Sequence, residues 1–244
     1  MKIIFIIAIC LLLVALIIVI WGVLTRWKFV CNKRDNYKKL STIPIYIINL
    51  NRSKDRWNIM QNNLKNLKIK NYNRFEGIDG KNYKLSYPEK KLFSNVDYDY
   101  RKDIGVVGCA LSHFYLWKQM LDNNQPKILI VEDDMRFDVP DISKSILDNL
   151  TEYDIIFLHH EHSFNSNSLI IPLKNAQWYG TGAHAYIINS KAAKYLVDKA
   201  IKDGFRNAID WFILNQYKYL KIGLINKPLF TQRDIPSIIQ HING

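Results

Sequence analysis

Cysteine is scarce in this chain, with three residues among 244. Cys10 lies in an apolar N-terminal run, Cys31 follows in a basic segment, and only Cys109 belongs to the rest of the chain. No disulfide can therefore form within the part of the sequence after the basic segment. Internal repeats, low-complexity blocks and a second long apolar run are also missing. These absences exclude a disulfide framework, a repeat array and a multi-pass membrane protein.

An uncharged apolar run from Ile3 to Leu24 opens the chain. As a helix it would be roughly 33 Å long, which is enough for a hydrocarbon core of about 30 Å. A cleaved signal peptide is the alternative, but its apolar region is shorter, about 7–15 residues, and ends at a small-residue site that this run lacks. We therefore predict a single-pass transmembrane anchor over 1–25, a basic stem over 26–43 and one folded domain over 44–244.

The charges around this run leave the side of the membrane open. Six lysines and arginines lie between residues 26 and 39, whereas only Lys2 and the amino terminus precede the run. The positive-inside bias favours a cytoplasmic domain. The same basic segment would equally suit a stem that lies on anionic lipid.

The chain is basic, with a formal net charge of +12. Such a balance suits anionic substrates, lipid surfaces or nucleic acid. However, the lysines are spread along the sequence and are not gathered into one stripe with interleaved aromatic residues. We interpret them as a solvated surface and expect no nucleic-acid partner.

Apolar strands alternate with amphipathic helices after residue 43. The expected strands are 43–50, 75–78, 127–131, 154–158 and 183–188, and the expected helices are 53–67, 106–121 and 190–204. Residues 81–103 are polar and tyrosine-rich, which is typical of an irregular loop. This alternation predicts an α/β domain with a mostly parallel sheet covered on both faces, and ligands bind at the carboxyl ends of such strands. Chemistry is therefore expected just after Asn49, Val131 and Leu158.

Three consecutive acidic residues, Glu132, Asp133 and Asp134, follow the strand that ends at Val131. Adjacent carboxylates repel one another, so a cation is a natural partner. In extended backbone Glu132 and Asp134 point to the same side, and oxygen ligands of this kind suit Mg²⁺ or Mn²⁺. An acidic surface turn is the alternative interpretation.

A basic cluster follows the first strand. Arg52 and Arg56 come one helical turn apart near a helix N-terminus, directly after Asn49 and Asn51. Guanidinium groups and free backbone N–H groups together suit a phosphate or a nucleotide edge. Surface arginines without a ligand are the alternative.

Three further candidates have two interpretations each. His113 lies on the apolar face of a helix, where a histidine is most often a satisfied core residue. The histidines at 159, 160 and 162 resemble a metal cluster, but neighbours on a strand point to opposite faces. Asp210 precedes Trp211 and is either a buried base or a helix cap.

These pieces in this order resemble glycosyltransferase family 25, the lipopolysaccharide-biosynthesis and procollagen galactosyltransferase-like family. The similarity spans about residues 44–240. The matching stretches are 47–52 with Arg56, 75–80, 105–113, 130–134, 180–183 with Tyr186, 209–212, and Pro228 with 232–238.

The resemblance implies a GT-A fold, which is an α/β, Rossmann-like nucleotide-sugar-binding domain, a UDP-sugar donor such as UDP-galactose, and Mn²⁺ or Mg²⁺. It assigns the metal to Glu132 and Asp134, and the general base to Asp210. It assigns donor binding to Asn49, Asn51, Arg52, Arg56, Asp79, His113 and Asp133. The chain departs from the family's pattern by having Glu first in its acidic triplet and by the spelling of the 234–238 tail, which leaves His241 without an assigned role.

The implied reaction is transfer of a hexose to a hydroxyl group. A general base opposite the leaving diphosphate inverts the anomeric centre, whereas retention requires a carboxylate nucleophile. The acceptor would be a glycan, a lipid-linked glycan or a protein, and the anchor makes the membrane a further partner. A membrane-anchored carbohydrate-binding protein without catalysis and a metal-dependent phosphohydrolase are the alternatives.

Overall fold

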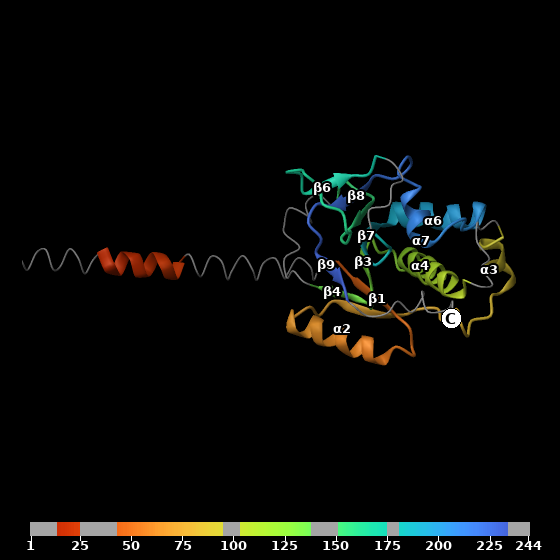
Figure 1. The fold of residues 1–244 in the computed structure, drawn as a ribbon, viewed down its shortest axis with the longest axis horizontal. Coiled ribbons are helices and arrows are strands. Elements are labelled where there is room, and N and C mark those ends of the chain that lie inside the picture. The colour runs from red at the N-terminus through yellow and green to blue at the C-terminus, as the bar shows by residue number, and fades with distance from the viewer. Residues whose placement is uncertain (1–13, 25–42, 95–102, 138–150, 175–180, 234–244) are drawn as a thin grey trace, which may run out of the picture.

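A seven-stranded sheet forms the centre of the protein. The computed structural model describes residues 14–24, 43–94, 103–137, 151–174 and 181–233 (Figure 1). The strand order in the sheet is β2-β1-β3-β7-β5-β8-β6. Their bounds are Ile45–Asn49 for β1, Tyr72–Glu76 for β2, Lys127–Glu132 for β3, Ile155–Phe157 for β5, Ile170–Pro172 for β6, Ala185–Asn189 for β7 and Ile222–Ile225 for β8.

The sheet is mixed, which corrects the expectation of a mostly parallel one. β1 runs parallel to both β2 and β3, and β5 runs parallel to β8. β7 lies antiparallel between β3 and β5, and β6 is antiparallel to β8. The amino end of β7 therefore meets the carboxyl ends of β1, β3 and β5 at one edge. A buried apolar strand has the same composition in either direction, so its direction could not be deduced from its residues.

Helices cover both faces of the sheet (Figure 1). On one face, α2 (Lys54–Asn66) buries Met60 and Leu64 against Ile45 and Ile47 of β1. On the other face lie α4 (Ile104–Asp122), α6 (Ser190–Asp203) and α7 (Ile209–Leu214). Successive side chains of a strand alternate between faces, so β1 contributes to both cores and all five of its residues are buried.

A two-stranded ribbon adjoins the sheet. β4 (Met135–Phe137) pairs antiparallel with β9 (Phe230–Gln232), and Met135 lies opposite Gln232. This pairing brings the residue after β9, Arg233, next to the acidic triplet, because the Arg233 N–H donates to the carbonyl of Asp134 at 2.9 Å.

The tyrosine-rich segment 81–103 is not wholly irregular. It contains a short helix, α3 (Tyr87–Leu92), which begins at a reciprocal cap between Ser86 and Glu89. The Glu89 side chain accepts hydrogen bonds from the Ser86 N–H and hydroxyl and from the hydroxyls of Tyr83 and Tyr115, each at 2.6 Å. The tyrosines therefore bind a buried carboxylate, and Tyr115 ties this segment to α4.

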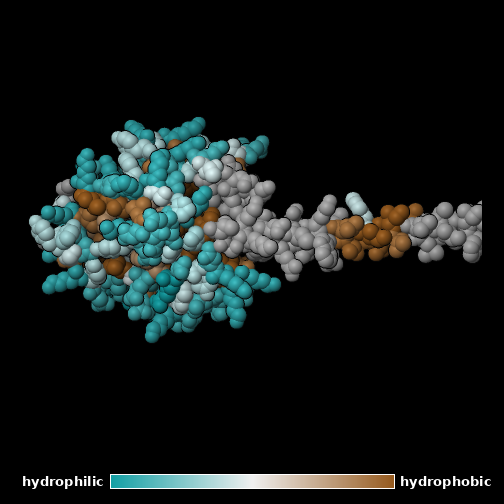
Figure 2. Space-filling view, turned by 180° about the vertical axis from the view of Figure 1, so that it is seen from behind, coloured by the Kyte–Doolittle hydropathy of each residue, from teal (hydrophilic) through white to brown (hydrophobic). Residues whose placement is uncertain are grey.

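The N-terminal region is described only in part. Residues 14–24 form a helix whose apolar side chains are exposed, and it contrasts with the largely hydrophilic domain surface in Figure 2. Within the described residues, no helix combines the length and the apolarity that crossing a membrane requires. Residues 1–13 and residue 25 of the expected anchor, and residues 26–42 of the expected stem, lie outside the described residues.

We expect Glu89 to make the protein less stable in acid. Burial alone would raise the pKa of Glu89, but the hydrogen bonds from Ser86, Tyr115 and Tyr83 lower it to about 2. A folded-state pKa below the unfolded one stabilises the protein above the unfolded pKa, and the contribution is lost as the pH falls toward the folded pKa. Glu89→Gln should therefore cost about 3 kcal/mol at pH 7 and about 1 kcal/mol at pH 3.

Urea unfolding at both pH values measures this difference. Glu152→Gln is the matched control, because the Glu152 side chain is exposed and its nearest cation, Lys221, is 3.9 Å away. An equal cost for Glu89→Gln at pH 7 and pH 3 would contradict the role assigned to the carboxylate.

Candidate functional site

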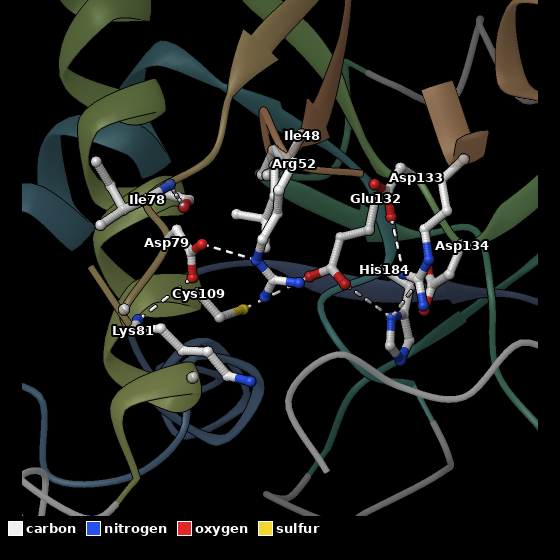
Figure 3. Close-up of a pocket in the computed structure, with 15 residues that line it drawn as sticks. Ile48, Arg52, Ile78, Asp79, Lys81, Cys109, Glu132, Asp133, Asp134 and His184 are labelled. Carbon is white, nitrogen blue, oxygen red and sulfur yellow. Dashed lines mark hydrogen bonds and ion pairs between the residues drawn. The ribbon is translucent and has the colours of Figure 1, made fainter. Parts of the chain in front are cut away.

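A pocket of about 100 Å³ opens at the edge where β1 and β3 end and β7 begins. Fifteen residues line it (Figure 3). They come from the end of β1 together with the turn after it and the start of α2, the turn at 78–81, the first half of α4, the acidic triplet at the end of β3 and the residue before β7. Five separate segments therefore converge on one cavity.

Glu132 lies at the centre of the polar groups in this pocket. Its Oε1 accepts from His113 Nε2 at 3.2 Å and from the Cys109 thiol at 3.6 Å. Its Oε2 lies 3.2 Å from His184 Nδ1. Burial alone would raise the pKa of Glu132, but the hydrogen bonds from the two histidines lower it far below its usual range. Glu132 is therefore an ionised carboxylate held from both sides.

A buried chain of donors sets the tautomer of His113. Trp117 Nε1 can only donate, and it lies 3.0 Å from the Tyr186 hydroxyl oxygen. The Tyr186 hydroxyl then donates its own proton to His113 Nδ1 at 2.8 Å. His113 consequently carries its proton on Nε2 and donates it to Glu132. All three rings are completely buried, so this chain of hydrogen bonds is shielded from water.

His184 is held over the pocket by an unusual backbone turn. Gly182 has a φ of +42°, and a Cβ at that position would lie 2.1 Å from the His184 ring. Only glycine leaves room for the imidazole there. Burial alone would lower the pKa of His184, but the hydrogen bond and charge of Glu132, with the charge of Asp134, raise it to about 9.

Asp133 faces away from Glu132 and Asp134. Its two oxygens accept from Asn49 Nδ2 at 2.5 Å and from Arg56 Nη1 at 3.0 Å. Asn49 in turn accepts from Arg74 Nε at 2.8 Å. Burial raises the pKa of Asp133 despite these donors. The residue thus joins the end of β1, the start of α2 and the acidic triplet.

Asp134 has one bound oxygen and one unsatisfied oxygen. Its Oδ2 accepts from Gln232 Nε2 at 3.0 Å, whereas the buried Oδ1 has no hydrogen-bond partner among the described residues. That oxygen lies 3.8 Å from His184 Nδ1. Burial and the charge of Glu132 raise the pKa of Asp134. A buried carboxylate oxygen left without a donor is costly unless a ligand satisfies it.

Glu132, Asp134 and His184 together form a group that fits a divalent cation. Each offers one ligand atom, and these atoms lie within 4.8 Å of one another. Two carboxylates and one imidazole are ligands that Mn²⁺ accepts, and carboxylates alone suit Mg²⁺. The unsatisfied Asp134 Oδ1 is part of this group, which supports the fit.

Three arginines surround this group. Arg52 donates to Asp79 at 2.7 Å across the pocket mouth, and Arg56 pairs with Asp133. The nitrogens Nη1 and Nη2 of Arg233 are buried and have no hydrogen-bond partner in the described part of the chain. Burial lowers the pKa of Arg233, and the charges of Asp133 and Asp134 oppose that shift. An anion would satisfy the unpaired nitrogens of Arg233, whereas the unpaired Asp134 Oδ1 needs a hydrogen-bond donor or a cation.

Asp210 occupies the first turn of α7, where its carboxylate accepts the N–H of Trp211 at 2.8 Å. Burial raises its pKa, and the charges of His184 and Glu132 also act on it. The carboxylate therefore caps its own helix and is electrostatically coupled to the pocket.

The structure brings most of the predicted site residues together. Arg52, Arg56, Asp79 and the acidic triplet line the pocket. The others do not line it: Asn49 is buried behind Asp133, His113 is buried behind Glu132, Asn51 lies in an exposed turn, and Asp210 caps α7.

The other predicted histidines lie elsewhere. His159 and His160 bind the backbone carbonyls of Phe230 and Ile225, and neither joins a metal-binding group among the described residues. His241 lies outside the described residues.

Sequence reasoning missed three residues of this region. His184 precedes a strand whose direction was not foreseen, and the glycine at 182 was its only local signal. Arg233 reaches the site through the β4–β9 pairing. Cys109 was considered only as a possible disulfide partner, although it lies one helical turn before His113 on α4.

One family model matches most of the chain. Residues 42–213, more than half of the chain, match the model of glycosyltransferase family 25, described as an LPS biosynthesis protein. A protein of Acanthamoeba polyphaga mimivirus named as a glycosyltransferase is 29% identical over 175 residues, which cover 65% of this chain and 53% of that protein. Procollagen galactosyltransferase 2 of Mus musculus is 35% identical over 109 residues, which cover 41% of this chain and 17% of that protein.

The chain thus spans about half of the viral relative and less than a fifth of the mouse one. Among solved structures, a glycosyltransferase involved in the glycosylation of the major capsid of PBCV-1 aligns with a TM-score of 0.39 at 8% identity. That alignment covers 80% of this chain and 94% of the other.

We expect the Tyr186 hydroxyl to be needed for stability. Tyr186→Phe removes the acceptor of Trp117 Nε1 and the donor to His113 Nδ1, and it leaves two buried polar atoms unpaired. The loss should lower the free energy of unfolding by about 1–3 kcal/mol. Tyr219→Phe is the control, because Tyr219 is 66% exposed, and it should change stability by less than about 0.5 kcal/mol. Equal unfolding midpoints for both variants in urea would show that the buried chain of donors contributes nothing.

Proposed function

Since this chain belongs to glycosyltransferase family 25, we propose that it transfers a hexose, galactose in the first instance, from a UDP-sugar to a hydroxyl group. Its domain would then be of the GT-A type, with the nucleotide sugar bound at the edge where β1 and β3 end. The mixed sheet flanked by helices and the pocket at that edge support this assignment. The observation that carries the proposal is the group formed by Glu132, Asp134 and His184 beside three arginines.

The metal of this proposal is Mn²⁺ or Mg²⁺, held by Glu132 and Asp134 with His184 as a third ligand. When bound, such an ion stabilises the negative charge that develops on a leaving diphosphate. The residues prepare that position in two ways. Glu132 is kept ionised by its neighbours, and Asp134 presents an oxygen that has no hydrogen-bond partner among the described residues.

The diphosphate is expected beside Arg56 and Arg233. Arg56 lies at the start of α2 and holds Asp133 in place, while the terminal nitrogens of Arg233 lack a hydrogen-bond partner among the described residues. Guanidinium groups bind phosphate oxygens in pairs, which suits a donor that carries two phosphates. Arg52 and Asp79 pair at the pocket mouth, so they are placed to contact the nucleoside end.

Asp210 is the proposed general base. Its carboxylate is half-buried and its raised pKa brings it nearer to the range in which a carboxylate removes a hydroxyl proton efficiently. Attack by the activated acceptor on the face opposite the diphosphate inverts the anomeric centre.

The proposed setting is a membrane surface. The apolar run from Ile3 to Leu24 and the basic segment after it would tether the domain to a bilayer. The acceptor would then be a lipid-linked glycan, another glycan or a protein carrying a hydroxyl group near that surface.

We expect Asp134→Asn to remove metal-dependent activity. The amide has the same shape but lacks the charge that a divalent cation needs, so UDP release from UDP-galactose in the presence of Mn²⁺ should fall on the order of 100-fold. Binding of Mn²⁺, measured by the paramagnetic resonance of the free ion, should weaken in parallel.

Asp198→Asn provides the control for this change, because Asp198 is exposed on α6 and pairs with the exposed Lys194 at 2.8 Å. Wild-type Mn²⁺ binding and turnover in Asp134→Asn would refute the metal assignment. If the folded wild-type protein released UDP from no donor, the carbohydrate-binding alternative would be favoured.

We expect Asp210→Asn to lower kcat by about 10²–10⁴-fold while leaving the KM for the donor unchanged, because a base acts only in the chemical step. Wild-type kcat should also fall in acidic solution as Asp210 takes up a proton, and the variant should keep only the decline that protonation of the metal-binding carboxylates causes. Steady-state kinetics as a function of pH measure both effects. The same acidic decline in wild type and variant would assign the base to another residue.

A further inference from the structure

Cys109 and His113 lie one helical turn apart on α4 and face the same carboxylate oxygen. Residues four apart share a helix face, so both side chains point from the helix toward the end of β3. There Glu132 Oε1 lies 3.6 Å from Cys109 Sγ and 3.2 Å from His113 Nε2. The cysteine and Glu132 line the pocket, whereas His113 is completely buried.

These separations are those of ligands around one small ion. In a tetrahedral zinc site with bonds of about 2.0–2.3 Å, the ligand atoms lie roughly 3.3–3.8 Å from one another. The three ligand atoms here all lie within 4.8 Å of each other. A cation could therefore be bound with little movement of the helix or the strand.

We propose that Cys109, His113 and Glu132 form a second cation site, which takes a thiophilic divalent ion, Zn²⁺. The fourth coordination position faces the pocket, because Cys109 and Glu132 both line it. The site is chemically different from the group of Glu132, Asp134 and His184, which has no sulfur. Thiolate and imidazole ligands select Zn²⁺ over Mn²⁺ and Mg²⁺.

His113 shares one feature with a metal-binding histidine, although without an ion its Nε2 carries the proton. Such a residue uses its second ring nitrogen to bind a fixed partner, which orients the ring. His113 Nδ1 lies 2.8 Å from the Tyr186 hydroxyl. With Nε2 on the ion, the imidazole proton moves to Nδ1 and is donated to Tyr186. The hydroxyl oxygen has two lone pairs, so it accepts from His113 and Trp117 together, and its own proton gives up the acceptor that it had at His113 Nδ1.

The protons balance on binding. Without an ion the Cys109 thiol is protonated, since burial and the nearby Glu132 charge raise its pKa. On binding, the sulfur–hydrogen bond is replaced by a sulfur–zinc bond, and one proton leaves to solvent. His113 changes tautomer and keeps its single proton. Glu132 belongs to both cation sites, because its Oε1 faces Cys109 and His113 and its Oε2 faces His184. Zn²⁺ bound beside Cys109 and His113 would therefore neutralise charge that Mn²⁺ requires beside His184. Inhibition of the Mn²⁺-dependent reaction by Zn²⁺ rests on the proposed function, whereas Zn²⁺ binding does not.

Co²⁺ is the probe that tests the site, because a thiolate bound to cobalt produces a charge-transfer absorption in the near ultraviolet. The full chain would carry Cys10→Ser and Cys31→Ser, so that Cys109 is its only thiol. Addition of Co²⁺ should produce the thiolate band together with the visible bands of tetrahedral cobalt, and Zn²⁺ should displace both.

Two variants in that background decide the result. Cys109→Ser keeps the size of the side chain and a donor to Glu132, and it should abolish the charge-transfer band and weaken Zn²⁺ binding at least 10-fold. Asp134→Asn should keep the band. A folded parent protein without the band, or a band that persists in Cys109→Ser, would overturn the proposal. Loss of Mn²⁺-dependent UDP release in Asp134→Asn, measured separately, tests the proposed function and is independent of the cobalt spectrum.

Discussion

The site depends on one carboxylate that is bound on both of its oxygens. Glu132 joins α4, through Cys109 and His113, to the residue before β7, through His184. Burying an ionised carboxylate is costly unless donors surround it, and here the donors come from two elements far apart in sequence. The ionised state of Glu132 and the packing of α4 against the sheet therefore support each other. Its charge in turn raises the pKa of His184.

The cores were predictable from sequence to a greater degree than the topology. Ile45 and Ile47 alternate with Tyr46 and Ile48 in β1, and the structure sends the pairs to opposite cores. The apolar pattern predicts burial but contains no information on the direction of a buried strand. The strand at 183–188 was predicted, but its antiparallel direction was missed, and that direction explains how His184 reaches the carboxyl ends of β1 and β3. The helix at Tyr87–Leu92 was missed for another reason, since its stability comes from Glu89 and not from apolar periodicity.

The acidic triplet and the arginines after β1 could be assigned to a site from the sequence, because charged residues that follow apolar strands are easily recognised. What these residues bind was not visible. Arg56 and Asn49 hold Asp133, so part of the basic cluster positions the acidic one. The buried guanidinium of Arg233 lies near the acidic triplet because β9 pairs with β4, and this pairing cannot be deduced from residue types. The contacts of Asp133 with Arg56 and Asn49 join residues 77 and 84 positions apart in the sequence. Such contacts can be recognised only once the fold is known.

The glutamate at the first position of the triplet has a physical reason in this fold. An aspartate is shorter by one methylene, roughly 1.5 Å. From the end of β3 it could not place one oxygen 3.2 Å from His113 and the other 3.2 Å from His184. The longer side chain spans the gap between helix α4 and the segment before β7. Asp134, which follows the strand and reaches only His184 and Gln232, needs no such length. The longer side chain of Glu132 therefore connects the buried His113 to the pocket. The shorter side chain of Asp134 keeps one oxygen without a hydrogen-bond partner among the described residues, and this oxygen is available to a ligand.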